Sequence, residues 1–339
     1  MRRLPTVVAA VCFVATCGSI LLTPAGCDKS SSSGGGGASG GSGSGTTKVI
    51  GVIPKGLTHV FWQSVKKGAE QAGDELKVQI KWDGPPNEKD INTQDRIIGD
   101  MVNRGVDALV VAPCDKTALV TSMAAAKKKM PVVVFDSGSD FKDYDAFVAT
   151  DNYKGGQLAG EAMVKLLEGK TNVELALIRY GAGSASTLDR ERGFIDVLKK
   201  ARPDVKLYDE QFAGSTGDEA ARLMSNLLQA HPNITAVYGS NESTTRGALG
   251  ALEQARKLGD LRFVGFDSSP ELVAALDKGQ IQALVLQDPV KMGYLSVKAA
   301  VTALRGEKVA KEQPIAPTLV TQENKGQPAI QELLRPRLK

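Results

Sequence analysis

The stretch Phe147-Val-Ala-Thr-Asp-Asn-Tyr-Lys-Gly-Gly-Gln-Leu-Ala-Gly160 decides the fold that we predict for this chain. Its strand-like residues end in Thr150 and Asp151, a pair suited to turning a corner and capping a helix. In the helix that follows, the Gly155-Gly156 pair gives a thin face for close packing despite its low helix propensity. Strand-like runs and helices alternate before this stretch, and the same alternation starts again after it. We therefore interpret the stretch as the passage from one α/β lobe into a second lobe built the same way.

Short apolar runs of the kind buried in parallel sheets recur along the chain from residue 48 onward. We predict strands at residues 48–54, 78–82, 108–112, 132–135, 147–150, 175–178, 206–208, 236–238, 263–266, 283–286 and 317–321. Helical patterns follow at residues 62–76, 88–103, 116–129, 186–201, 218–230, 244–257, 270–278 and 290–306, besides the helix after Asp151. This alternation predicts an α/β fold with doubly wound parallel sheets and right-handed crossovers. We expect a polar tail after the last strand.

Polar and aromatic residues follow most of the predicted strands. Ligands of parallel sheets bind beyond the carboxyl ends of the strands, so these residues form the candidate site. They lie at residues 55–62, 136–138, 179–180, 239–242, 267–269 and 287–288. Each group alone is better explained by helix capping, for which Asp, Asn and Ser are preferred. One such group at the end of most strands indicates a polar cleft between the lobes, which is a natural small-molecule site.

Composition and charge exclude several classes of function. The chain has 339 residues, 42% of them hydrophobic and 24% charged, with a net charge of +4, all ordinary for a soluble globular protein. Its basic residues form no stripe with interleaved aromatic residues, so we expect no nucleic-acid partner. The sequence has no phosphate-binding loop and no zinc-spaced set of His or Cys. We therefore expect no metal and no cofactor.

The first 27 residues have the pattern of a secretory signal peptide. Arg2-Arg3 precedes an apolar run over residues 7–22, which is too short for a comfortable membrane span. The ending Ala25-Gly26-Cys27 resembles the lipobox of bacterial lipoproteins, whose Cys is lipidated and becomes the first residue. Pro24 stands where that motif usually has Leu, which leaves open a plain cleaved signal or an uncleaved anchor. Residues 29–47 are almost all Ser and Gly, so we expect a flexible tether.

From about residue 48 onward the chain resembles the type 1 periplasmic substrate-binding proteins, in the branch that binds ribose, galactose and xylose. The motifs that carry the resemblance are Phe61-Trp62, Pro131–Asp136, Val148–Asn152 with Gly155-Gly156, Arg190–Phe194, Ala236–Asn241, Val264–Asp267 and Leu286–Pro289. Each motif alone is weak, but the set occurs in order over nearly all of the chain after the tether. Members of this family have two lobes, close like a hinge on a sugar and deliver it to an ABC transporter. The resemblance implies the same fold and activity here.

The resemblance also implies which residues bind the ligand. They are Lys55, His59, Phe61, Trp62, Asp136, Ser137, Arg190, Asn241, Asp267 and Gln287. Phe61 and Trp62 would stack on a sugar face, and the carboxylates and amides would hold its hydroxyls. Ser137 and Leu188 stand where ribose-binding proteins have Arg. Lys55 or His59 could replace one of these charges, and Arg190 could turn into the cleft, so the sequence leaves this point open. The expected ligand is a neutral sugar or polyol of monosaccharide size, not tuned to ribose.

Three crossings between the lobes are expected, near Asp151, near residues 287–288 and near Ala316. The first rests on the repeat described above, and the other two rest on the resemblance. The expected organisation is a signal peptide at 1–27, a tether at 28–47, a first lobe at 48–151 plus 288–316, a second lobe at 152–287 plus 317–330, and a tail at 331–339.

These expectations combine into a monomeric solute-binding lipoprotein in the periplasm or on the outer face of the cell envelope, lipidated on Cys27, with an ABC permease as its partner. A co-receptor that presents its ligand to a membrane sensor needs the same surface, so the sequence does not separate the two. A glycosidase with Asp136 and Asp267 as its carboxylate pair is a third alternative. We expect no enzyme, because two carboxylates alone carry little weight. A repressor of this fold would need a DNA-binding segment where the signal and tether stand.

Overall fold

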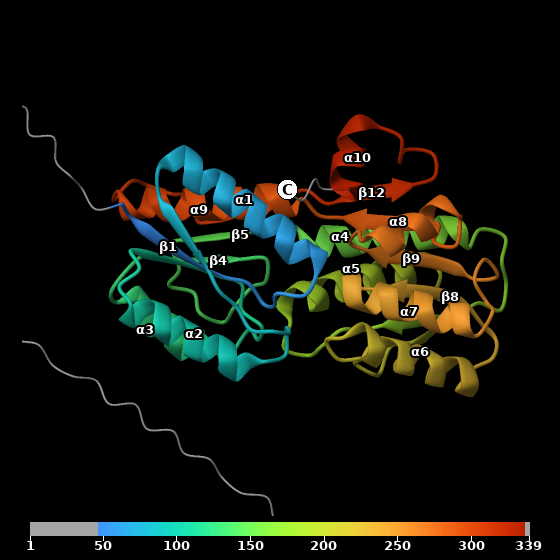
Figure 1. Cartoon of the computed structure of the whole chain (residues 1–339). Coiled ribbons are helices and arrows are strands. Elements are labelled where there is room, and N and C mark those ends of the chain that lie inside the picture. Colours follow the sequence, from blue (N-terminus) through green and yellow to red (C-terminus); the bar gives the residue numbers. More distant parts are fainter. Residues whose placement is uncertain (1–46, 336–339) are drawn as a thin grey trace, which may run out of the picture. The chain divides into compact units, whose positions relative to one another are not determined.

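This computed structural model describes residues 47–335, all within one compact unit that spans Thr46–Lys339. The predicted signal peptide, Cys27 and nearly all of the tether lie outside the described residues, as do the last four residues. The described residues form two six-stranded sheets with helices on both faces (Figure 1). The predicted α/β class with two similar lobes is therefore confirmed.

The first sheet has the strand order β11-β5-β4-β3-β1-β2, and all of its pairs are parallel. Its strands are β1 (Val49–Ile53), β2 (Gln79–Trp82), β3 (Ala108–Val111), β4 (Val132–Phe135), β5 (Ala146–Thr150) and β11 (Glu312–Ile315). Every residue of β3 and β4 is buried, as expected for central strands covered on both faces. Helices α1 (Val60–Leu76) and α9 (Pro289–Leu304) cover one face, and α2 (Ile91–Asn103) and α3 (Val120–Lys127) cover the other (Figure 1).

The second sheet repeats this order as β12-β10-β9-β8-β6-β7. Its strands are β6 (Glu174–Ile178), β7 (Lys206–Tyr208), β8 (Ile234–Gly239), β9 (Arg262–Phe266), β10 (Ala283–Leu286) and β12 (Thr318–Thr321). Helices α4 (Asn152–Leu166) and α5 (Ala185–Ala201) pack on one face. The other face carries α6 (Gly217–Ala230), α7 (Glu242–Gln254), α8 (Pro270–Asp277) and α10 (Pro328–Leu334).

The chain passes from one sheet to the other between β5 and α4, between β10 and α9, and between β11 and β12. The first two passages are built alike. Asp151 caps α4 by accepting a hydrogen bond from the Lys154 N–H, and Asp288 caps α9 by accepting one from the Lys291 N–H. Each passage is therefore a strand end followed directly by a capped helix, which is the geometry expected for Thr150-Asp151.

Three features differ from the prediction. Strand β11 was missed, since Glu312-Gln-Pro-Ile315 contains no apolar run. Strand β12 pairs with β10 antiparallel, because the chain enters the second sheet straight from β11 with no helical crossover to reverse its direction. The prediction of a polar tail after the last strand was also wrong. Residues 328–334 form helix α10, which buries Ile330 and Leu334 against the second sheet.

Candidate functional site

Two aspartates occupy equivalent places at the carboxyl ends of the two sheets. Asp136 follows β4 and Asp267 follows β9, each directly after a buried Phe. Their φ angles are 61° and 68°, a conformation that few non-glycine residues adopt. Each aspartate donates its backbone N–H to a carbonyl of the neighbouring strand, on Val148 or Val285, at 2.9 Å. Strained backbone of this kind is concentrated at functional sites, so the pair directs attention to the space between the lobes.

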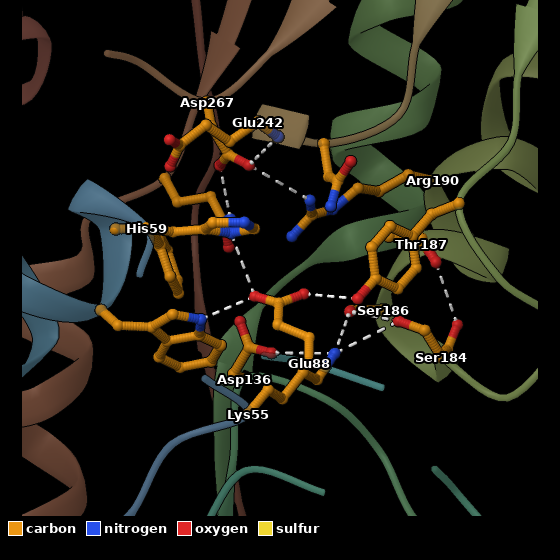
Figure 2. Close-up of a pocket in the computed structure, with 15 residues that line it drawn as sticks. Lys55, His59, Glu88, Asp136, Ser184, Ser186, Thr187, Arg190, Glu242 and Asp267 are labelled. Carbon is orange, nitrogen blue, oxygen red and sulfur yellow. Dashed lines mark hydrogen bonds and ion pairs between the residues drawn. The ribbon is translucent and has the colours of Figure 1, made fainter. Parts of the chain in front are cut away.

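A cavity of about 30 Å³ lies in that space and is partly open to solvent (Figure 2). Its lining residues are Lys55, His59, Phe61, Trp62, Glu88, Asp136, Tyr180, Ser184, Ser186, Thr187, Arg190, Asn241, Glu242, Asp267 and Gln287. All of the residues expected to bind ligand are among them except Ser137. The hydroxyl of Ser137 instead accepts a hydrogen bond at 3.1 Å from the N–H of Ser186, across the lobes. The position of the cavity between the lobes suits a small-molecule site, and the contact of each residue with a ligand stays a prediction.

Lys55 and Asp136 form a buried ion pair on the side of the first lobe, with 3.3 Å between Lys55 Nζ and Asp136 Oδ2. The same ammonium donates to the hydroxyls of Ser184 and Ser186 in the second lobe, at 3.2 Å each. Burial raises the pKa of Asp136, although the charges of Lys55 and Arg190 act in the opposite direction. One lysine therefore ties the two lobes together at the floor of the cavity.

Glu88 is the centre of a second cluster that the sequence did not assign to the site. Its Oε1 accepts from Trp62 Nε1 at 2.6 Å and lies 3.2 Å from His59 Nδ1, and its Oε2 accepts from the Tyr180 hydroxyl at 2.6 Å. Burial alone would lower the pKa of His59, but Glu88 outweighs it and raises that pKa to about 9. His59 is thus an imidazolium at neutral pH, and Glu88 fixes both it and the indole.

The sequence did contain a feature that could have placed Glu88 in the site. Glu88 lies between β2 and α2, on the same edge of the sheet as the other strand ends. The predicted helix was drawn from Glu88, whereas α2 begins at Ile91 after the cap Asp90. The misplaced helix start assigned Glu88 to a helix and removed it from the loop. Ser184, Ser186 and Thr187 carried no comparable signal, because they lie on or beside the first turn of α5.

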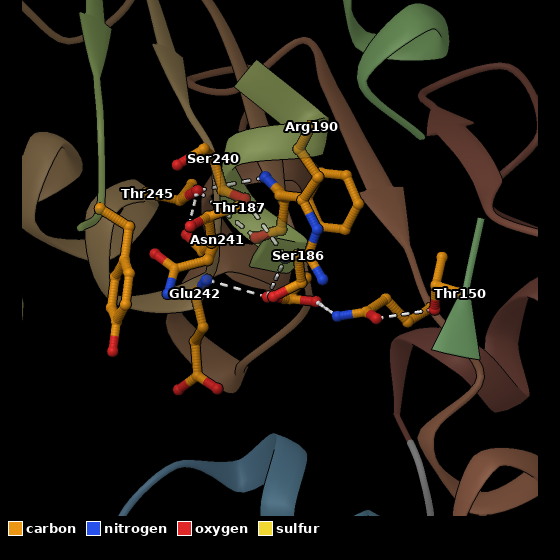
Figure 3. Close-up of polar contacts among 12 residues, drawn as sticks. Thr150, Ser186, Thr187, Arg190, Ser240, Asn241, Glu242 and Thr245 are labelled. Carbon is orange, nitrogen blue, oxygen red and sulfur yellow. Dashed lines mark hydrogen bonds and ion pairs between the residues drawn. The ribbon is translucent and has the colours of Figure 1, made fainter. Parts of the chain in front are cut away.

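Arg190 leads a third cluster, which reaches from the cavity to the passages between the sheets (Figure 3). Its Nε donates to Asn152 Oδ1 at 2.8 Å, and its Nη1 lies 3.7 Å from Asp267 Oδ2. The guanidinium also lies over the Phe266 ring, 3.9 Å from its centroid. On the far side, Asp267 Oδ1 accepts from Gln287 Nε2 at 2.7 Å, and Thr150 donates to Gln287 Oε1 at 2.7 Å.

Thr150 and Gln287 are the last residues before two of the passages between the sheets, so this cluster joins the cavity to the segments about which the lobes would turn. Asn241 takes the capping role considered above, since its side chain accepts from the Thr244 N–H at 3.0 Å while it also lines the cavity. Phe61 and Trp62 meet edge to face with centroids 4.8 Å apart.

Direct contacts between the lobes surround the cavity. The Lys116 N–H donates to the Gly183 carbonyl at 3.0 Å, and Lys89 and Glu219 form an ion pair at 2.7 Å. Together with the bonds of Lys55, Ser137 and Tyr180, these contacts hold the lobes in a closed arrangement. Within residues 47–335, no helix is long and apolar enough to span a membrane. The same residues contain no group of three His, Cys, Asp or Glu side chains placed to hold a metal ion.

Two sheets of the same strand order, three passages between them and a polar cavity at their carboxyl ends define a hinged solute-binding protein. The family model described as "Periplasmic binding protein domain" matches residues 50–308, and the chain belongs to that family. The predicted family is thereby confirmed.

Among curated relatives, the ribose import binding protein of Bacillus subtilis (strain 168) is 31% identical over 274 residues, which covers 80% of this chain and 87% of the relative. The D-allose-binding periplasmic protein of Escherichia coli (strain K12) is 32% identical over 266 residues, which covers 76% of this chain and 85% of the relative.

Solved structures of solute-binding proteins are also similar to this chain. A carbohydrate transporter solute-binding protein from Agrobacterium radiobacter, in complex with D-arabinose, has a TM-score of 0.82 and 32% identity, with 86% of this chain and all of that chain covered. An ABC transporter solute-binding protein from Agrobacterium vitis, with bound D-fucose, has a TM-score of 0.80 and 34% identity. The match covers 84% of this chain and 99% of that chain.

Proposed function

We propose that this chain is an extracytoplasmic receptor that captures a small sugar or polyol between its two lobes and delivers it to the permease of an ABC importer. The observation that carries the proposal is the cavity, where carboxylates, amides, hydroxyls and an indole from both lobes converge. Sugar hydroxyls suit carboxylates and amides, and the C–H face of a sugar ring suits an aromatic side chain. The relatives described above are binding proteins for ribose and D-allose, which supports the same ligand class here.

We propose no catalytic role for the aspartate pair. Asp136 lies 3.3 Å from the Lys55 ammonium, and Asp267 accepts from Gln287 and from the Glu242 N–H. Carboxylates engaged in this way are suited to positioning a ligand.

The structure bears on which sugar is bound. The expectation that ribose would be disfavoured rested on the absence of Arg at Ser137 and Leu188. Arg190 and Lys55 nevertheless place two cationic donors at the cavity. Ribose therefore belongs in the panel of candidate ligands, beside D-allose, D-arabinose and D-fucose.

A thermal-shift screen of the purified protein against these four sugars tests the proposal. A ligand at about 100 times its Kd stabilises the native state by roughly 2.7 kcal/mol, so the true ligand should raise the Tm by roughly 5 °C or more. Sucrose, a disaccharide larger than the proposed ligand, controls at the same concentration for the general stabilising effect of carbohydrate. If none of the four sugars raises the Tm above this control, the proposed ligand class is wrong.

The lipid anchor is a separate proposal. Its support is the sequence pattern Arg2-Arg3, the apolar run and Ala25-Gly26-Cys27, all outside the described residues. We expect the wild-type protein to fractionate with membranes and the variant Cys27→Ser to lose its lipid. A wild-type protein that is already unlipidated and found in the soluble fraction would contradict the proposal, and Pro24 would be the reason.

A further inference from the structure

Seven acidic or basic side chains line the cavity besides the phenol of Tyr180, and six of the seven form three pairs. Lys55 pairs with Asp136 at 3.3 Å, His59 with Glu88 at 3.2 Å, and Arg190 with Asp267 at 3.7 Å. The seventh is Glu242, the first residue of α7. The cavity therefore contains one carboxylate more than it contains cations.

Glu242 is 2% exposed, and its Oε2 has no hydrogen-bond partner among the described residues (Figures 2 and 3). Its other oxygen lies 3.7 Å from Nη1 of Arg246. That arginine is half exposed and makes its shorter ion pair, at 2.7 Å, with Glu271. A buried oxygen without a partner costs roughly 1–3 kcal/mol, so the site favours a ligand that supplies a donor.

We propose that Glu242 is a specificity-determining residue of the cleft, whose carboxylate accepts a hydrogen bond from a ligand hydroxyl and selects neutral sugars over sugar phosphates. The proposal rests on the sugar-binding function proposed above. A phosphate would enter a cavity whose cations are already paired and whose remaining free group is acidic.

The surroundings of Glu242 predict how binding depends on pH. Burial raises the pKa of Glu242 to about 7; the charge of Asp267 acts in the same direction, while His59 and Arg246 oppose it. The backbone N–H of Phe61, in the first turn of α1, also favours the carboxylate. A ligand hydroxyl that donates to the carboxylate binds its deprotonated form. Affinity for a neutral sugar should therefore increase as pH rises through about 7, and level off above it.

Calorimetry of the full chain at pH 6, 7 and 8 tests the proposal, with D-ribose, D-allose and D-arabinose and the terminal phosphate ester of each as probes. We expect the neutral sugar that binds most tightly to gain about tenfold in affinity between pH 6 and 8, since the carboxylate fraction changes by that factor. In Glu242→Gln this gain should disappear, and affinity at pH 8 should fall roughly tenfold. In Glu242→Gln, the ratio of the affinity for the neutral sugar to the affinity for its phosphate ester should also become smaller.

The matched control is Glu253→Gln, which removes an exposed carboxylate from the same helix and should retain the wild-type pH profile. Melting curves establish that each variant is folded, and Glu242→Asp, which keeps the charge, should keep the pH dependence. If the wild type binds a sugar and Glu242→Gln shows the same affinity and pH profile, this inference is wrong and the proposed function stands. If a phosphate ester binds as tightly as its parent sugar, the selectivity claim is wrong. If no sugar binds the wild type, the proposed function fails and this inference fails with it.

Discussion

Replacing Asp136 with Ala is expected to abolish tight sugar binding and to destabilise the protein at the same time. The change leaves the Lys55 ammonium buried, at 3% exposure, with only two serine hydroxyls as partners. An uncompensated buried charge of this kind costs roughly 3 kcal/mol or more in stability. Loss of a carboxylate that holds a ligand hydroxyl should reduce affinity by roughly a hundredfold, measured by calorimetry.

The double variant Lys55→Met/Asp136→Ala separates the two effects. Removing both charges eliminates the unpaired ammonium, so most of the lost stability should return while the affinity stays low. If Asp136→Ala kept the melting temperature and the affinity of the wild type, the ion pair would have neither of the roles assigned to it. If the double variant regained wild-type affinity, Asp136 would matter only through its lysine partner.

The second large effect is expected from Gly68→Ala, at a residue of α1 that does not line the cavity. A Cβ at Gly68 of α1 would lie 1.9 Å from the Val290 carbonyl oxygen of α9, and a Cβ at Gly293 of α9 would lie 2.0 Å from the Val65 carbonyl oxygen. The two helices are thus in contact through their backbones. Overpacking of a well-packed site costs roughly 1–3 kcal/mol, and a clash with rigid backbone belongs at the upper end or above it. We expect the Tm to fall by roughly 10 °C.

Gly99→Ala is the matched control within the first lobe. Gly99 is exposed in α2, and a Cβ there would meet nothing within 4 Å. The same substitution should therefore stabilise the protein slightly, by roughly 0.5–1 kcal/mol, because alanine favours the helix. Equal melting temperatures for the two variants would show that α1 and α9 can separate at little cost.

Glycine packing is also where the sequence predicted local structure well. The thin face expected at Gly155-Gly156 exists, since a Cβ at Gly156 would lie 2.0 Å from the Arg190 carbonyl oxygen of α5. A short stretch could show that this helix packs closely, because the glycines are adjacent. It could not show the partner. The contact between Gly68 and Gly293 joins residues more than two hundred positions apart, and no local pattern reports such a pairing.

Strands and helices with strong periodic patterns were predictable, and the elements that lack such patterns were not. Strand β9 is a buried apolar run, whereas β11 is an edge strand that contains Pro314 and polar residues. Helix α10 is seven residues long, so its signals are limited to Pro328 at its first position and the spacing of Ile330 and Leu334. The reversed direction of β12 depends on the route between the sheets, which is a property of the whole fold.

The residues of the candidate site also divide into those that the sequence could predict and those that it could not. Strand ends such as Asp136 and Asp267 are visible in the sequence because they follow apolar runs. Glu88 and the serines of α5 reach the cavity only through the closure of two lobes, which tertiary structure alone determines. The sequence also could not show that Glu242 lacks a partner, since a missing hydrogen bond requires coordinates.

Calorimetric titration of the wild-type protein with D-ribose, D-allose, D-arabinose and D-fucose tests the central claim most directly, namely that the cavity between the lobes binds a small sugar. We predict that at least one of them binds with a stoichiometry of one and a Kd in the micromolar range or below, and that Asp136→Ala removes the signal. A folded protein that releases no heat of binding with any of the four sugars at millimolar concentration would contradict the account.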